Sequence, residues 1–193
     1  MKVILLGTKG GPRIMEGVAK PTCNVLDTGS EFCLIDCGLG VSISLVNAGY
    51  PLNKLKAIFI THHHSDHTLE LGPLIHTAWN SGLHHEITVY GPVGTMDLLD
   101  NFYQSQILDI TIRIEDEKLR DIREMVKVVE YDSGQIAEFA GMQVSAMRNE
   151  HPPIKNSFAL KFEGQGKKIV FSGDTRYIPE MAEFATGADL LIH

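Results

Sequence analysis

The chain has 193 residues, of which 44% are hydrophobic, and its formal net charge at pH 7 is −7. This length suits one domain with a sizeable core and is too short for two ordinary domains, so we expect residues 1–193 to form a single domain. The acidic balance argues against a surface built to hold tRNA or duplex DNA. No apolar stretch approaches the length of a membrane span, and the first residues lack the features of a signal peptide.

Strand-like and helix-like patterns alternate along the first half of the chain. Short apolar runs predict strands at residues 3–6, 33–36, 57–60 and 87–90. Apolar residues at helical spacing predict helices at residues 41–48, 69–79 and 96–103, although Gly72 and Pro73 weaken the prediction of a continuous second helix. The alternation predicts an α/β fold.

The second half is more charged at first and then becomes strand-like. Residues 113–130 carry many charges of both signs but keep an apolar face, which predicts a surface helix, with a lid over a site as the alternative. Residues 157–162 and 168–171 predict a hairpin. The three cysteines, Cys23, Cys33 and Cys37, form no repeated zinc-type pair, so we predict buried free thiols and a cytoplasmic protein.

The strongest chemical signal follows the strand predicted at residues 57–60. His62, His64, Asp66 and His67 fit the pattern H-x-H-x-D-H. Residues two apart on an extended backbone project to the same side, so His62 and His64 can bind one ion, and Asp66 and His67 in the next turn can reach a second. Imidazole and carboxylate together suit zinc or a similar divalent metal. The alternative is a histidine-rich surface loop without metal.

Two later positions extend this cluster. His151 precedes Pro152 and Pro153, whose rings fix the loop backbone, and Asp174 lies in a glycine turn at the end of an apolar strand. Taken alone, each would be an ordinary loop residue. Together with the histidine cluster they become candidate ligands.

In chain order, these segments resemble the metallo-β-lactamase-fold hydrolases: residues 7–12 (GTKGGP), 34–38 (LIDCG), 61–67 (THHHSDH), His151 and residues 172–175 (SGDT). The resemblance spans the chain and is closest to the branch of ribonuclease Z and the metal-dependent arylsulfatases. It implies a four-layer αββα sandwich. Members of the branch carry a last ligating histidine beyond the segment that aligns with His193, so we expect a C-terminally truncated domain that lacks the last part of the second half.

The resemblance also implies the ligands of a dinuclear site. His62, His64 and His151 would hold the first Zn²⁺, Asp66 and His67 the second, and Asp174 would bridge the two ions, with Mn²⁺ or Fe²⁺ as alternative metals. The implied reaction is two-metal hydrolysis, in which Asp66 orients the attacking water and accepts its proton.

Asp36 has two open interpretations. It either holds a ligating histidine in one tautomer or is a buried turn residue.

Ribonuclease Z proteins insert a long basic arm between the third histidine and the Gly-Asp turn, whereas here a simple hairpin joins His151 to Asp174. We therefore predict a small-molecule ester as the substrate, with sulfate esters first and nucleic acid disfavoured. Phosphodiesterase, ribonuclease Z-like endoribonuclease and lactonase activities are the alternatives. A different class of function is an inactive metal-binding fragment. The apolar edge that a truncation would expose predicts self-association, so a homodimer is a further expectation.

Overall fold

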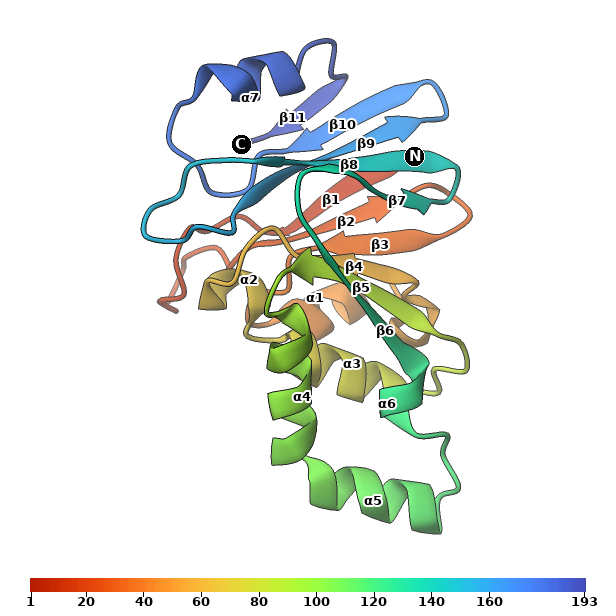
Figure 1. Ribbon diagram of the computed structural model, residues 1–193. Helices are drawn as coiled ribbons and strands as arrows, with labels where there is room; N and C mark the ends of the chain where they lie inside the picture. The colour runs from red at the N-terminus through yellow and green to blue at the C-terminus, as the bar shows by residue number, and fades with distance from the viewer. The chain divides into compact units, whose positions relative to one another are not determined.

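The computed structural model describes residues 1–193, which divide into two compact units. The N-terminal unit comprises Met1–Ile60 and His64–Glu130, and the C-terminal unit comprises Thr61–His63 and Tyr131–His193. Each unit has one β-sheet with helices beside it (Figure 1). The short segment Thr61–His63 joins the C-terminal unit because the Phe158 N–H donates to the Thr61 carbonyl at 3.1 Å.

Six strands form the sheet of the N-terminal unit, in the order β1-β2-β3-β4-β5-β6. The first three pair antiparallel, whereas β3, β4 and β5 pair parallel and need helical crossovers between them. The strands are β1 (Lys2–Gly7), β2 (Cys23–Asp27), β3 (Phe32–Ile35), β4 (Ala57–Phe59), β5 (Ile87–Pro92) and β6 (Val126–Tyr131). The four predicted strands are confirmed as β1, β3, β4 and β5, while β2 escaped prediction.

Helices of the N-terminal unit provide the crossovers and cover its sheet. They are α1 (Val41–Asn47), the 3₁₀ turn η1 (Leu52–Lys54), α2 (Ser65–Thr68), α3 (Leu71–Asn80), α4 (Thr95–Ser105), α5 (Ile107–Asp116) and α6 (Ile122–Met125). One buried core joins strand residues such as Leu34 and Ile58 to helix residues such as Leu45 and Leu74. In Figure 1, α4 leads away from the sheet and α5 lies at its far end.

The predicted helix at residues 69–79 is confirmed as the continuous helix α3. Pro73 is its third residue, within the first turn, where the backbone N–H has no intrahelical partner to lose. Gly72 allows close packing, because a Cβ there would lie 2.3 Å from the Phe102 ring of α4. The two residues that weakened the prediction therefore suit the start of a packed helix.

The single surface helix predicted for residues 113–130 is wrong. Helix α5 ends at Asp116, the one-turn helix α6 follows, and β6 begins at Val126 as the last strand of the sheet. Asp121 starts α6 by accepting a hydrogen bond from the Arg123 N–H at 2.9 Å. From Val126 onward, pairing with β5 stabilises an extended backbone, which overrides the helix-like charge pattern.

The C-terminal unit has a five-stranded sheet in the order β11-β10-β9-β8-β7. Its strands are β7 (Gly134–Phe139), β8 (Met142–Arg148), β9 (Phe158–Gly164), β10 (Lys167–Phe171) and β11 (Leu190–Ile192). The predicted hairpin is confirmed, since β9 and β10 pair antiparallel. Helix α7 (Pro179–Phe184) connects β10 to the parallel strand β11, and its Met181 packs on Ala159 and Val170.

Cys23, Cys33 and Cys37 are buried free thiols, as predicted, and burial raises the pKa of each thiol well above its usual range. None of the helices combines the length and apolar character that a membrane span would need.

Candidate metal centre

The predicted ligands follow the ends of buried strands. All three residues of β4 are buried, and the chain passes from this strand through Ile60 and Thr61 to His62. Asp36 directly follows β3, the parallel neighbour of β4. The carboxyl edge of parallel strands is where α/β proteins gather polar side chains, because the strands fix the loops that leave them.

In the N-terminal unit, the short helix α2 organises the second half of the histidine motif. His64 precedes this helix in an extended conformation, and its carbonyl accepts hydrogen bonds from the His67 N–H at 3.0 Å and the Thr68 hydroxyl at 3.1 Å. The helical turn places Asp66 and His67 in the interior, with 4% and 1% exposure. Two groups that water would readily solvate are thus held inside the protein.

Asp36 fixes the His67 ring. Its Oδ2 lies 2.8 Å from His67 Nδ1, and both side chains are buried. An ionised carboxylate can only accept a hydrogen bond, so this contact favours the His67 tautomer with the proton on Nδ1 and the lone pair on Nε2. This contact supports the first of the two interpretations of Asp36. The φ of 65° shows that Asp36 is a turn residue as well.

Asp66 lies beside the Nε2 edge of the His67 ring. Its Oδ2 is 3.6 Å from His67 Nε2 and accepts a hydrogen bond from the Gly11 N–H at 2.6 Å. The backbone of Asp66 is also closely packed, because a Cβ on Gly38 would lie 2.4 Å from the Asp66 carbonyl oxygen. The carboxylate and the ring nitrogen therefore offer two donor atoms toward one point.

Glu70 anchors the loop next to this pair. Its carboxylate accepts hydrogen bonds from the backbone N–H groups of Gly40, Val41 and Ser42 at the start of α1. Its own N–H donates to the Cys37 carbonyl at 3.0 Å, and the Cys37 N–H donates to the His67 carbonyl at 2.7 Å. A carboxylate at a helix N-terminus is favourable, so Glu70 joins α1, the Asp36 loop and α2 into one rigid support.

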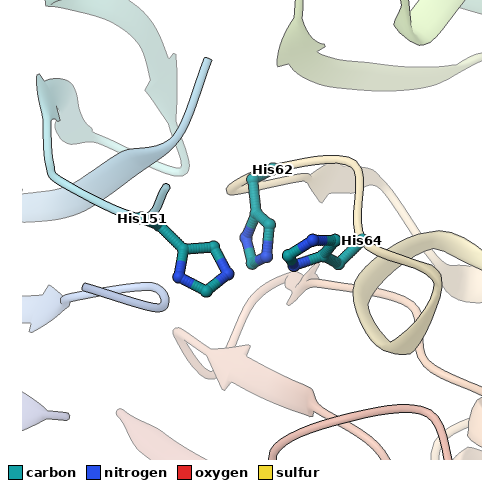
Figure 2. Close-up of side chains that lie close together, drawn as sticks. All are labelled: His62, His64 and His151. Carbon is teal, nitrogen blue, oxygen red and sulfur yellow. The ribbon is translucent and has the colours of Figure 1, made fainter. Parts of the chain in front are cut away.

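In the C-terminal unit, His62 meets His151 and Asp174. The rings of His62 and His151 are edge to face, with centroids 4.9 Å apart (Figure 2). His151 Nε2 lies 3.8 Å from Asp174 Oδ2. Thr61 Oγ1 is 3.1 Å from His62 Nδ1. His64, the third side chain drawn in Figure 2, follows His62 by two residues in the chain.

Hydrogen bonds join the loops that carry His151 and Asp174. Buried Asn149 donates from Nδ2 to the Ser172 carbonyl at 2.7 Å, and the Arg176 N–H donates to the Glu150 carbonyl at 2.9 Å. The side chains of Glu150 and Arg176 form an ion pair. Gly173 is needed in this turn, because its φ is +59° and a Cβ would lie 2.7 Å from the Phe158 carbonyl oxygen. The spacing of His151 and Asp174 is thus fixed by the backbone.

The six predicted ligands fall into two groups, one in each unit. His64, Asp66 and His67 belong to the N-terminal unit, and His62, His151 and Asp174 belong to the C-terminal unit. Sequence reasoning missed the Gly11 N–H and the Asn149 side chain. The glycine-rich segment was visible in the sequence, but its backbone donor was not, and a lone asparagine before Glu150 gave no signal.

The chemistry of the donor set fits divalent metals. Four imidazoles and two carboxylates are present, and borderline ions such as Zn²⁺ prefer this mixture of nitrogen and oxygen ligands. The tautomer selected by Asp36 leaves an imidazole nitrogen with a lone pair, as a metal ligand requires. The residues present therefore suit metal binding.

Comparisons with known proteins agree with this chemistry. The family model described as anti-Pycsar protein Apyc1 matches residues 1–193. Ribonuclease Z of Mycobacterium marinum is 30% identical over 196 residues, which cover 100% of this chain and 70% of that protein. Ribonuclease Z of Mycobacterium sp. (strain KMS) is 31% identical over 195 residues, which cover 100% of this chain and 68% of that protein.

Solved structures give the fold. The short form of human tRNase Z superposes with a TM-score of 0.78 at 25% identity, covering 100% of this chain and 77% of that one. The metallo-β-lactamase fold protein YhfI of Bacillus subtilis gives a TM-score of 0.73 at 24% identity, covering 98% of this chain and 68% of that one. The predicted α/β class of the metallo-β-lactamase type is confirmed.

Proposed function

Because the chain belongs to the family of the anti-Pycsar protein Apyc1 and is a metal-dependent hydrolase of the metallo-β-lactamase fold, we propose that it hydrolyses a phosphodiester. Sulfate esters were the substrate predicted first from the sequence. The relatives named ribonuclease Z favour the phosphodiester alternative, since the bond that a ribonuclease cleaves is a phosphodiester. The observation that carries the hydrolase chemistry is the buried Asp66 beside His67, whose ring Asp36 orients.

Two divalent ions are part of the proposal, with Zn²⁺ as the metal. His62, His64 and His151 would hold the first ion through neutral nitrogens, which the edge-to-face approach of His62 and His151 supports. Asp66 and His67 would hold the second, and Asp174 would bridge the two. The distance of 3.6 Å between Asp66 Oδ2 and His67 Nε2 suits two ligands of one ion, because bonds of about 2.0 to 2.2 Å leave their donor atoms this far apart.

The side chains then have separate roles in the reaction. When bound, such a metal pair supplies Lewis acidity and lowers the pKa of water toward neutrality. Asp66 accepts the proton of the attacking water at a carboxylate oxygen. His67 keeps its proton on Nδ1, in the hydrogen bond to Asp36, and presents Nε2 as a ligand. Burial of these groups excludes competing water and strengthens their electrostatic interactions.

A small phosphodiester, rather than tRNA, is the proposed substrate class. The hairpin between His151 and Asp174 turns through Gln165 and Gly166 and leaves no room in the sequence for a basic arm. The net charge of −7 also disfavours the many phosphate contacts that polynucleotide binding uses. A compact substrate with one phosphate needs only the local positive charge of the ions.

A chromogenic substrate series tests the proposal. Zinc-loaded protein is given bis(p-nitrophenyl) phosphate, p-nitrophenyl sulfate, a lactone or a tRNA precursor, and cleavage is measured with each. We expect the phosphodiester to be cleaved fastest among the small substrates. Asp66→Ala should lower that rate by several orders of magnitude, whereas the exposed Asp116→Ala on α5 should leave it unchanged. Faster cleavage of the sulfate ester, or equal rates with Asp66→Ala and the parent, would refute it.

A further inference from the structure

The glycine-rich turn at residues 7–12 has no role in the proposed reaction, and it lacks the Gly-Lys-Ser/Thr sequence that ends a phosphate-binding loop. We propose that this turn is a positioning element for Asp66, in which the Gly11 N–H orients the carboxylate and Lys9 holds the turn in shape. The inference rests on the proposed function insofar as Asp66 is a ligand of the second ion. All the residues concerned lie in the N-terminal unit.

The central observation is a hydrogen bond between residues far apart in sequence. The Gly11 N–H donates to Asp66 Oδ2 at 2.6 Å, across 55 positions of the chain. Oδ2 is also the oxygen that lies 3.6 Å from His67 Nε2. The amide therefore fixes the oxygen that faces the ring nitrogen. Hydrogen bonds to an ionised acceptor are short and about twice as strong as neutral ones, so this contact can select one orientation of the carboxylate.

Lys9 holds the turn that presents this amide. Its Nζ donates to the Gly10 carbonyl at 3.1 Å and to the Gly11 carbonyl at 2.8 Å, which ties the two peptide oxygens together. The Lys9 backbone is fixed as well, because its N–H donates to the Lys20 carbonyl at 3.0 Å. With the carbonyls held by the ammonium group, the Gly11 N–H remains directed at Asp66.

The conformation of Gly11 requires glycine for a backbone reason. Its φ is +84°, in the left-handed region, whereas a Cβ there would meet only Lys9 Nζ, at 3.9 Å. Gly11→Ala would therefore shift the turn through φ strain without a steric clash. Gly29 is a matched control, since its φ is +94° and a Cβ would have no neighbour within 4 Å. Exposed Lys54 is the control for the loss of one lysine charge in the same unit.

The experiment measures metal affinity. Metal-free Gly11→Ala, Lys9→Met, Gly29→Ala, Lys54→Met and parent proteins are titrated with Zn²⁺ against a chromogenic chelator. We expect the first two variants to bind the second ion about 10- to 100-fold more weakly, the range found when a residue supporting a ligand is lost, with the first ion unchanged. The two controls should bind both ions as the parent does. Equal effects of Gly11→Ala and Gly29→Ala would overturn the inference.

A double-mutant cycle separates positioning from a general effect on the fold. If Gly11 acts through Asp66, Gly11→Ala should change zinc affinity and urea denaturation of the metal-free protein much less in an Asp66→Ala background than in the parent. Full additivity in both measurements would overturn the inference. Hydrolysis of bis(p-nitrophenyl) phosphate is measured separately. A parent protein that binds zinc but cleaves no phosphodiester would refute the proposed function, and the zinc titrations would still test the positioning of Asp66.

Discussion

Asp36→Asn should weaken binding of the second metal ion by at least tenfold while the protein stays folded. Asparagine has nearly the same volume and tolerates a positive φ, so the backbone at φ 65° can be kept. The change removes the negative charge that accepts the His67 Nδ1 proton at 2.8 Å. The amide can also donate to Nδ1, which would move the ring proton to Nε2 and block that nitrogen as a ligand.

The magnitude follows from the burial of the pair. A hydrogen bond to a charged group contributes about 1.5 to 3 kcal/mol. At about 1.4 kcal/mol for each factor of ten in an equilibrium constant, losing it corresponds to roughly 10- to 100-fold in affinity. Exposures of 1% and 2% for the two side chains mean that water cannot replace the lost contact. Asp36→Ala should cost more, because alanine adds strain at a positive φ.

Zinc titration of the metal-free variants provides the assay, with Asp27→Asn as the control. Asp27 also accepts a short hydrogen bond, from the Tyr50 hydroxyl at 2.8 Å, but has no ligand as its partner. We expect this control to lower stability without changing zinc affinity. An Asp36→Asn protein with the affinity of the parent, or a control with the same loss of affinity, would refute the proposed role of Asp36.

Three further outcomes can be checked by urea denaturation or zinc titration. Partial burial, with the hydrogen bond to Asp27, raises the pKa of Tyr50 to about 12, so the neutral phenol is favoured in the folded state. The contribution of Tyr50 to the free energy of unfolding should therefore be complete below about pH 10 and decline as the pH rises toward 12. Tyr50→Phe should destabilise the protein more at pH 8 than at pH 11. Glu70→Gln should lower the free energy of unfolding by about 1 to 2 kcal/mol, because a charged cap on three N–H groups of α1 is lost, whereas exposed Glu16→Gln should have little effect. Asn149→Ala should weaken zinc binding through His151 and Asp174, because it removes the 2.7 Å hydrogen bond to the Ser172 carbonyl. Unchanged zinc binding would show that the Glu150–Arg176 contacts hold the two loops without the Asn149 side chain.

The sequence by itself determined the elements whose signal is local. Strands β1, β3, β4 and β5 are short apolar runs that end in turn residues, and α3 has a clear helical spacing. The candidate ligands of the H-x-H-x-D-H pattern could likewise be recognised from the sequence, because alternation on an extended backbone and the turn that follows are local geometry. His151 and Asp174 could be found only by adding a family resemblance to weak loop signals.

Only the tertiary structure decided which groups support these side chains. The last part of the charged segment, from Val126 onward, forms the strand β6 through pairing with β5, a non-local contact that outweighs its charge pattern. The sequence left open whether Asp36 is only a turn residue or also the partner of a histidine. In the fold, Asp36 Oδ2 lies 2.8 Å from His67 Nδ1. The Gly11 N–H could not be read from the sequence at all, because every residue except proline has a backbone donor and only the fold directs this one at Asp66.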